Sequence, residues 1–93
     1  MNKKKLKIAR KKVDQLDQKI FNLIKKRTQI VKYMLSLKKF KKEIIDHRRI
    51  SEILKKIKKR SIKNSIDPNL TKRIWKSMIW SYVEFQRKNF KKK

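Results

Sequence analysis

The sequence is poor in the residues that build most metal and cofactor sites. It contains no cysteine, no glycine, a single histidine (His47) and only seven acidic residues. The lack of cysteine excludes disulfides and thiolate chemistry, and the lack of glycine excludes a P-loop or a dinucleotide-binding turn. Because one histidine and few carboxylates leave little from which to build a metal cluster, we expect no bound metal.

Long apolar runs are also missing from the chain. No run of consecutive apolar residues exceeds about three, whereas a membrane-spanning helix needs about 20. The basic N-terminus is not followed by the apolar segment of a secretory signal. We therefore expect a cytoplasmic protein with no membrane partner.

The net charge of +25 is the most prominent feature of the composition. A basic surface typically indicates a nucleic-acid partner or an anionic membrane surface. Here 25 lysines outnumber 7 arginines, whereas specific phosphate and base contacts favour arginine. Because the lysines are also spread over the whole chain, we interpret them as a solvated coat that binds nucleic acid only non-specifically, at low salt.

The 93 residues predict a single domain over residues 1–93, and the apolar residues recur at helical spacing. The longest pattern predicts a helix over residues 6–38, roughly 50 Å long. Residues 39–45 lose this period and are expected to form a loop. The apolar positions of the first helix are Leu6, Val13, Leu16, Ile20, Leu23, Ile24, Val31, Met34 and Leu35.

Two further helices are predicted from their capping residues. Asp46 is a suitable N-cap for the second helix, and polar residues 61–65 are expected to form the next connection. Asp67 and Pro68 supply the N-cap and the first helical residue of the third helix. No strand pattern is present, so the predicted fold class is all-α with three helices. Their apolar stripes are Ile50, Ile53, Leu54 and Ile57, and then Ile74, Trp75, Met78, Ile79, Tyr82 and Phe85.

Polar residues interrupt the apolar stripes on the sides expected to face the interior. Four of them are cations, and buried cations need anionic partners. Because the acidic residues on the same faces are too few to neutralise them, an anionic ligand is the natural complement. The interrupting residues are Arg10, Arg27 and Lys38 in the first helix, Asp46 and Arg49 in the second, and Gln86 in the third.

The spacing of the cations in the first helix predicts a site shared between two copies of the chain. Arg27 and Lys38 are separated by roughly 16 Å, so their side chains can hold the two ends of a small dianion. Arg10 is roughly 42 Å from Lys38 along the same helix and cannot join them in one chain. If two first helices cross antiparallel near residue 21, Arg10 of one copy lies between Arg27 and Lys38 of the other. A two-fold homodimer would then contain two equal sites.

Three segments carry these residues at a distinctive joint spacing. They are IARKKVDQLDQKIFNLIKKRTQIVKYMLSLK, DHRRISEIL and IDPNLTKRIWKSMIWSYVEFQ. With this spacing, the chain resembles the all-helical chorismate mutase family, the AroQ class, over about residues 6–88. The resemblance rests on Arg10, Val13, Leu16, Asp17, Arg27 and Lys38, on Asp46 with Arg49, and on Gln86 after Ile66, Asp67 and Pro68.

The resemblance implies an intertwined antiparallel homodimer that converts chorismate to prephenate. This pericyclic step needs no nucleophile, metal or cofactor, because the enzyme only has to fold the substrate and stabilise charge on its ether oxygen. It also implies residue roles. Arg27 and the partner's Arg10 would hold the two carboxylates, Lys38 and Gln86 would donate to the ether oxygen, Arg49 would support a carboxylate, and Asp46 would lie near the ring hydroxyl.

Two positions depart from the usual mutase pattern. Mutases of this class commonly read D-x-x-R-E, whereas Ile50 replaces that glutamate here. Tyr82 stands where some mutases carry a small hydroxyl residue. Both features are closer to the isochorismate-pyruvate lyase branch of the same fold, which is the alternative enzyme. The alternative of another class is a basic helical nucleic-acid-binding protein, whose binding would fall steeply with salt.

Overall fold

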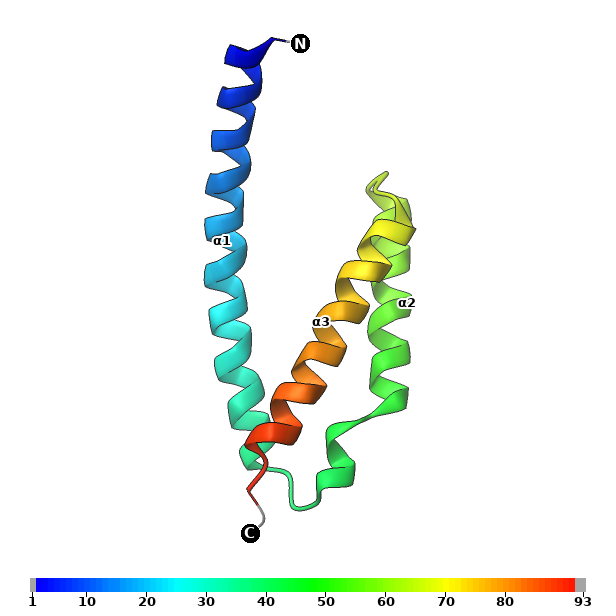
Figure 1. Cartoon of the computed structure of the whole chain (residues 1–93). Coiled ribbons are helices and arrows are strands. Elements are labelled where there is room, and N and C mark those ends of the chain that lie inside the picture. Colours follow the sequence, from blue (N-terminus) through cyan, green and yellow to red (C-terminus); the bar gives the residue numbers. More distant parts are fainter. Residues whose placement is uncertain (1, 92–93) are drawn as a thin grey trace. The chain divides into compact units, whose positions relative to one another are not determined.

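A computed structural model describes residues 2–91, and within that range the chain forms helices and no strands (Figure 1). The helix α1 spans Lys3–Ser36, α2 spans His47–Lys63 and α3 spans Pro68–Asn89. A short 3-10 helix, η1, spans Lys41–Ile44. The prediction of an all-α fold with three α-helices is confirmed, although α1 both begins and ends a few residues earlier than the predicted range of 6–38.

The chain divides into two compact units, residues 1–33 and 34–93. The first unit consists of the greater part of α1 and contains no second element among its described residues. A single helix cannot bury its own apolar stripe. The exposed apolar side chains of this unit are Ile8, Val13, Leu16, Ile20, Phe21, Leu23, Ile24, Ile30 and Tyr33.

The predicted N-caps of α2 and α3 are both present. The Asp46 carboxylate accepts a hydrogen bond from the Arg49 backbone amide, at 3.0 Å. The Asp67 carboxylate accepts one from the Asn69 amide at 2.8 Å, and Pro68 occupies the start of α3. Each carboxylate satisfies an amide at a helix start that has no partner within the helix, which fixes where the helix begins.

The loop predicted over residues 39–45 contains the single turn η1. The Glu43 carboxylate accepts hydrogen bonds from the backbone amides of Lys39 (2.7 Å) and Phe40 (2.8 Å). The amide of Phe40, followed by that of Lys39, holds the pKa of Glu43 below its ordinary value, because both donate to the ionised carboxylate. A charged side chain therefore closes the turn that connects α1 to α2.

The connection predicted over residues 61–65 is shorter than expected, because α2 continues to Lys63. The Ser61 hydroxyl donates to the Ile57 carbonyl at 2.7 Å and lies 2.6 Å from the Thr71 hydroxyl. These contacts satisfy the polar group, so Ser61 is only 3% exposed within the helix. The helix ends at Lys63 with Asn64 as its C-cap, and Ser65 follows with a positive φ of 56°.

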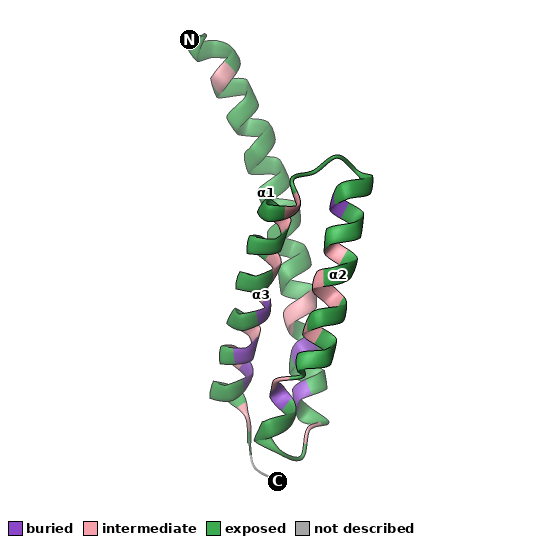
Figure 2. Cartoon of the chain, turned by 90° about the vertical axis from the view of Figure 1, so that its right-hand side faces the viewer, coloured by how far each residue is buried: buried purple, intermediate pink, exposed green. Residues whose placement is uncertain are grey.

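The core of the second unit joins α3 to the segment around η1. Leu35 in the last turn of α1, Ile44 in η1 and Val83 in α3 are buried together, with Ile45 and Phe90 packed against them (Figure 2). The helix α2 packs along α3. No helix within residues 2–91 has both the length and the apolar composition needed to cross a bilayer.

Candidate functional site

The two residues predicted to donate to the ether oxygen lie in direct contact. The Lys38 ammonium donates a hydrogen bond of 2.7 Å to the side-chain carbonyl of Gln86. Lys38 follows the end of α1, and Gln86 lies in the last turns of α3. These residues are 48 positions apart in the sequence, so only the tertiary structure brings them together.

The hydrophobic core explains why these two side chains meet. Leu35 and Val83 belong to the same buried cluster, and each precedes one of the two polar residues by three positions. Gln86 is one turn from Val83 within α3, and Lys38, although beyond the end of α1, donates its amide to the Leu35 carbonyl at 3.1 Å, so each polar residue lies on the same side as its apolar neighbour. The packing of Leu35 against Val83 therefore places Lys38 beside Gln86.

Gln86 is held in a defined orientation and is 8% exposed. Its side-chain amide nitrogen donates to the Tyr82 carbonyl at 3.2 Å, while its carbonyl accepts from Lys38. A lysine ammonium has three donors and a glutamine amide nitrogen has two. Beyond these two hydrogen bonds, the pair retains N–H groups of the kind that would stabilise a developing negative charge on an oxygen atom.

Tyr82 lies one turn before Gln86 on α3 and is half-buried. Its ring meets the Phe85 ring edge to face, with a centroid distance of 6.3 Å and an interplanar angle of 89°. An aromatic pair of this geometry prefers a fixed arrangement. The phenol is thus carried on the same stretch of α3 as the Lys38–Gln86 contact.

Asp46 and Arg49 are exposed at the start of α2. One carboxylate oxygen of Asp46 serves as the helix cap. The Arg49 guanidinium lies 3.9 Å from the Glu52 carboxylate, and the Arg49 side chain is 57% exposed. An exposed pair at this distance contributes little to stability and can exchange its partner for a ligand.

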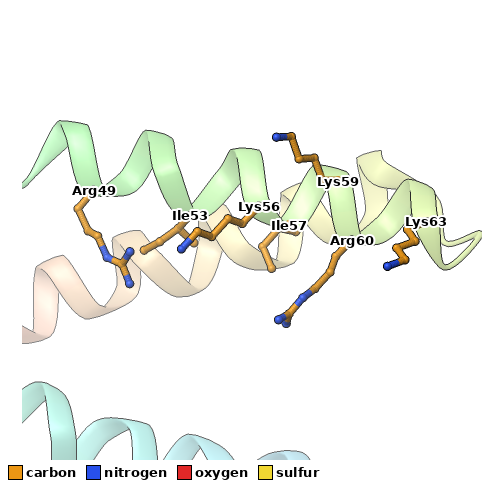
Figure 3. Close-up of a pocket in the computed structure, with 7 residues that line it drawn as sticks. All are labelled: Arg49, Ile53, Lys56, Ile57, Lys59, Arg60 and Lys63. Carbon is orange, nitrogen blue, oxygen red and sulfur yellow. The ribbon is translucent and has the colours of Figure 1, made fainter.

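Arg49 and Ile50 line different grooves, although they are neighbours in the sequence. Arg49 belongs to a groove of about 410 Å³ on α2 (Figure 3). Ile50 lines a second groove, together with His47, Leu54 and Pro68. Successive helical residues point about 100° apart, and this turn separates the two side chains.

Arg10 and Arg27 lie in the first unit, on α1, where Arg10 is exposed and Arg27 is half-buried. The other candidate residues, Lys38, Asp46, Arg49, Ile50, Tyr82 and Gln86, lie in the second unit. The convergence of the two arginines with Lys38 stays a prediction. Within residues 2–91, no three His, Cys, Asp or Glu side chains gather as they would around a metal ion.

Sequence reasoning did not identify the groove that continues beyond Arg49. The groove is also lined by Ile53, Lys56, Ile57, Lys59, Arg60 and Lys63. The signal that could have revealed it is the spacing of residues 49, 53, 56, 60 and 63, which alternates steps of four and three and so keeps to one side of a helix. In the composition, these cations were indistinguishable from the general lysine coat.

Comparison with known proteins gives one informative match. The family model described as chorismate mutase type II matches residues 9–87. That range includes all eight candidate residues, from Arg10 to Gln86, and extends over most of the chain. Neither the curated proteins nor the solved structures yield a match.

Proposed function

The chain belongs to the chorismate mutase type II family, and we propose that it catalyses the rearrangement of chorismate to prephenate. The single observation that carries this proposal is the 2.7 Å hydrogen bond between the Lys38 ammonium and the Gln86 carbonyl. Negative charge builds on the ether oxygen as the bridge bond breaks. Two adjacent N–H donors, already oriented before the reaction, are the groups that such a transition state requires.

The substrate would be held by cations at its two carboxylates. Arg27 of one copy and Arg10 of the partner copy serve this role, and Arg49 supports a carboxylate from α2. Fixed cations bind the dianion and impose the folded conformation from which a one-step rearrangement proceeds. No residue of the chain has to act as a nucleophile or to exchange a proton with the substrate.

The proposal includes a homodimer because one chain cannot supply all of these groups. Arg10 precedes Lys38 by 28 positions, most of them within α1, and at about 1.5 Å per helical residue this stretch is far longer than an arginine side chain can reach. A second copy brings its own Arg10 to the site, and symmetry gives two equal sites. The exposed apolar side chains of the first unit, among them Val13, Leu16 and Ile20, support a partner along α1.

Isochorismate-pyruvate lyase is the second candidate, favoured by two residues. Ile50 has no polar atom with which to hold the ring hydroxyl, and Tyr82 places a half-buried aromatic ring one turn before Gln86. The hydroxyl occupies a different ring position in isochorismate. Loss of one hydroxyl contact therefore alters the balance between the two substrates.

In the deciding experiment, the purified protein is incubated with chorismate and with isochorismate in parallel, and the rates of prephenate and salicylate formation are measured. Formation of prephenate as the faster reaction supports the proposal, and formation of salicylate as the faster one supports the lyase. Salt concentration is varied in the same series. Non-specific nucleic-acid binding falls steeply with salt, so binding to an oligonucleotide without turnover of either substrate would favour the nucleic-acid-binding alternative.

A further inference from the structure

The carboxylate of Glu43 holds the chain directly behind the Lys38–Gln86 contact. It accepts hydrogen bonds from the backbone amides of Lys39 at 2.7 Å and Phe40 at 2.8 Å, the two residues that follow Lys38. The Glu43 amide in turn donates to the Phe40 carbonyl at 3.0 Å. The proposed chemistry gives this side chain no role, although it closes the turn from which Lys38 extends.

The backbone of Lys38 is held from both sides. On its N-terminal side, the Lys38 amide donates to the Leu35 carbonyl at 3.1 Å, just beyond the last residue of α1. On its C-terminal side, the next two amides of the chain donate to Glu43. The last turn of α1 therefore fixes the chain as far as Lys38, and Glu43 fixes it immediately afterwards.

The hydrophobic core anchors Glu43 through its neighbour in the sequence. Ile44 is 5% exposed and is buried together with Leu35 and Val83. The segment that contains Lys38 thus begins and ends in the same buried cluster. A functional side chain is held most precisely where packed and hydrogen-bonded residues support it.

Like charges gather in the turn that Glu43 closes. Residues 38–42 include four lysines, and Glu43 is the only acidic residue within positions 18–45. Repulsion between neighbouring ammonium groups favours an open segment over a closed one. The Phe40 amide lowers the pKa of Glu43 most, and the charge of Lys38 lowers it further. The ionised carboxylate therefore opposes the repulsion within this segment.

We propose that Glu43 is a positioning residue, which holds the Lys38 ammonium against the Gln86 carbonyl by closing the turn behind it. It acts through Lys38 and makes no contact with the substrate. The consequence for catalysis rests on the proposed function, in which Lys38 and Gln86 donate to the ether oxygen. Without Glu43 the lysine charge is still present, but it is no longer fixed at the place where negative charge develops.

The test is a double-mutant cycle between Glu43 and Lys38, with kcat and KM measured for the substrate that the wild type converts faster. Glu43→Ala should lower kcat by about tenfold and change KM by less than about twofold, because the donor contributes mainly in the transition state. In a Lys38→Ala background, the same substitution should change kcat by less than about twofold, since no ammonium remains to be positioned. A purely structural role would lower kcat by the same factor in both backgrounds.

Glu43→Gln is the conservative variant. Its side-chain carbonyl oxygen can accept both amides, so kcat should stay within about threefold of the wild-type value. Asp14→Asn makes the matching change at an exposed carboxylate of α1 and is the control, with wild-type kcat expected. Thermal melts confirm that each variant is folded at the assay temperature. Wild-type kcat in Glu43→Ala, an equal loss in both backgrounds, or a loss in Glu43→Gln as large as that in Glu43→Ala would overturn the inference.

A readout that does not depend on turnover separates this inference from the proposed function. In ¹H–¹⁵N spectra, the side-chain amide of Gln86 reports on the hydrogen bond from the Lys38 ammonium, and its signal is assigned by its loss in Gln86→Ala. Glu43→Ala should move this signal towards its position in Lys38→Ala, and Asp14→Asn should leave it in place. If the signal moves but the wild type converts neither chorismate nor isochorismate, the proposed function fails and the positioning of Lys38 by Glu43 stands. If the wild type is active but the signal stays in place and the cycle shows no coupling, the inference fails and the proposed function stands.

Discussion

At the scale of single residues, the orientation of Gln86 matters as much as its identity. Its carbonyl is engaged by Lys38 and its amide nitrogen by the Tyr82 carbonyl. A glutamine amide stays neutral at every pH at which the protein is folded, so its N–H groups are always available as donors. Lys38, by contrast, supplies a full positive charge at the same place.

Replacement of either residue should therefore slow the chemical step. We expect Lys38→Ala and Gln86→Ala each to lower kcat by roughly a hundredfold, about 3 kcal/mol, with a smaller rise in KM, because these donors strengthen towards the transition state. Steady-state kinetics with chorismate measure both constants. Lys39→Ala, at an exposed neighbouring position, should retain wild-type rates. Wild-type kcat in the Lys38 and Gln86 variants would contradict the site assignment.

Ile50 is the residue on which the choice between mutase and lyase can be tested. A charged hydrogen bond is worth about 1.5–3 kcal/mol, enough to reorder two similar substrates. We expect Ile50→Glu to raise the kcat/KM for chorismate rearrangement relative to that for isochorismate elimination by roughly tenfold or more. The measurement is kcat/KM for both substrates, with thermal melts to confirm folding.

Leu54→Glu supplies the control for this substitution, because Leu54 lines the same groove as Ile50 but lies a turn further along α2. It should leave the ratio of the two activities unchanged. If Ile50→Glu folds and binds substrate without moving the ratio towards the mutase, Ile50 does not discriminate between the substrates. Tyr82 would then be the next position to vary.

At the scale of elements, the turn between α1 and α2 depends on one ionised carboxylate. Two backbone amides donate to Glu43 and lower its pKa from the ordinary 4.5. A carboxylate whose pKa is lower in the folded state stabilises that state above its ordinary pKa. The contribution is lost as the pH falls through the lower, folded value.

Removal of this charge should therefore make Tm depend less on pH in the acidic range. We expect Glu43→Gln to have a lower Tm than the wild type at neutral pH, and a smaller fall in Tm on acidification to about pH 3. Thermal melts across this range measure both effects. Glu84→Gln, which alters an exposed carboxylate 3.9 Å from Lys88, serves as the control and should follow the wild-type profile. An unchanged acid dependence in Glu43→Gln would contradict the role of Glu43.

The elements that the sequence could predict are those marked by local chemistry. Two helix starts are marked in the sequence by Asp46, Asp67 and Pro68. They can be predicted because an N-cap side chain accepts its hydrogen bond from an amide within the next three residues. The extension of α2 through Ser61 could not be predicted in this way. Its hydroxyl is satisfied partly by Thr71, a tertiary contact that a local pattern does not contain.

In the site, too, local sequence predicts some features and tertiary contacts determine the others. Helical spacing alone selects Lys38 and Gln86 as polar residues on inward faces, but their contact depends on the packing of Leu35 against Val83. The separation of Arg49 from Ile50 follows from the helical turn between them, but the groove of Ile50 is completed by Pro68 and Asn69 of α3, which depends on the packing of the two helices. The cations of the Arg49 groove were obscured for a compositional reason, since lysine occupies most solvated positions of this chain.

At the scale of the whole molecule, a net charge of +25 opposes any association between two copies. The burial of apolar surface in the proposed dimer has to exceed that repulsion. Screening by salt weakens repulsion between exposed like charges. In the proposed dimer, the exposed apolar side chains of α1 would supply this burial and the lysines would stay in solvent.

A shared site in this dimer predicts complementation between inactive chains. Arg10→Ala and Arg27→Ala should each be nearly inactive alone, because each damages both sites of its homodimer. In the heterodimer, one site combines Arg27 of the first chain with Arg10 of the second and is intact. Equal mixing followed by subunit exchange should restore about a quarter of wild-type activity, since about half of the dimers are mixed and each has one working site.

The control pairs Arg27→Ala with Lys38→Ala. Because both of these residues serve the site of their own chain, every site in that mixture carries a defect and no activity should return. Subunit exchange is followed independently by native mass spectrometry. Exchange without recovery in the Arg10 and Arg27 mixture, or equal recovery in the control, would show that the partner's Arg10 does not complete the site.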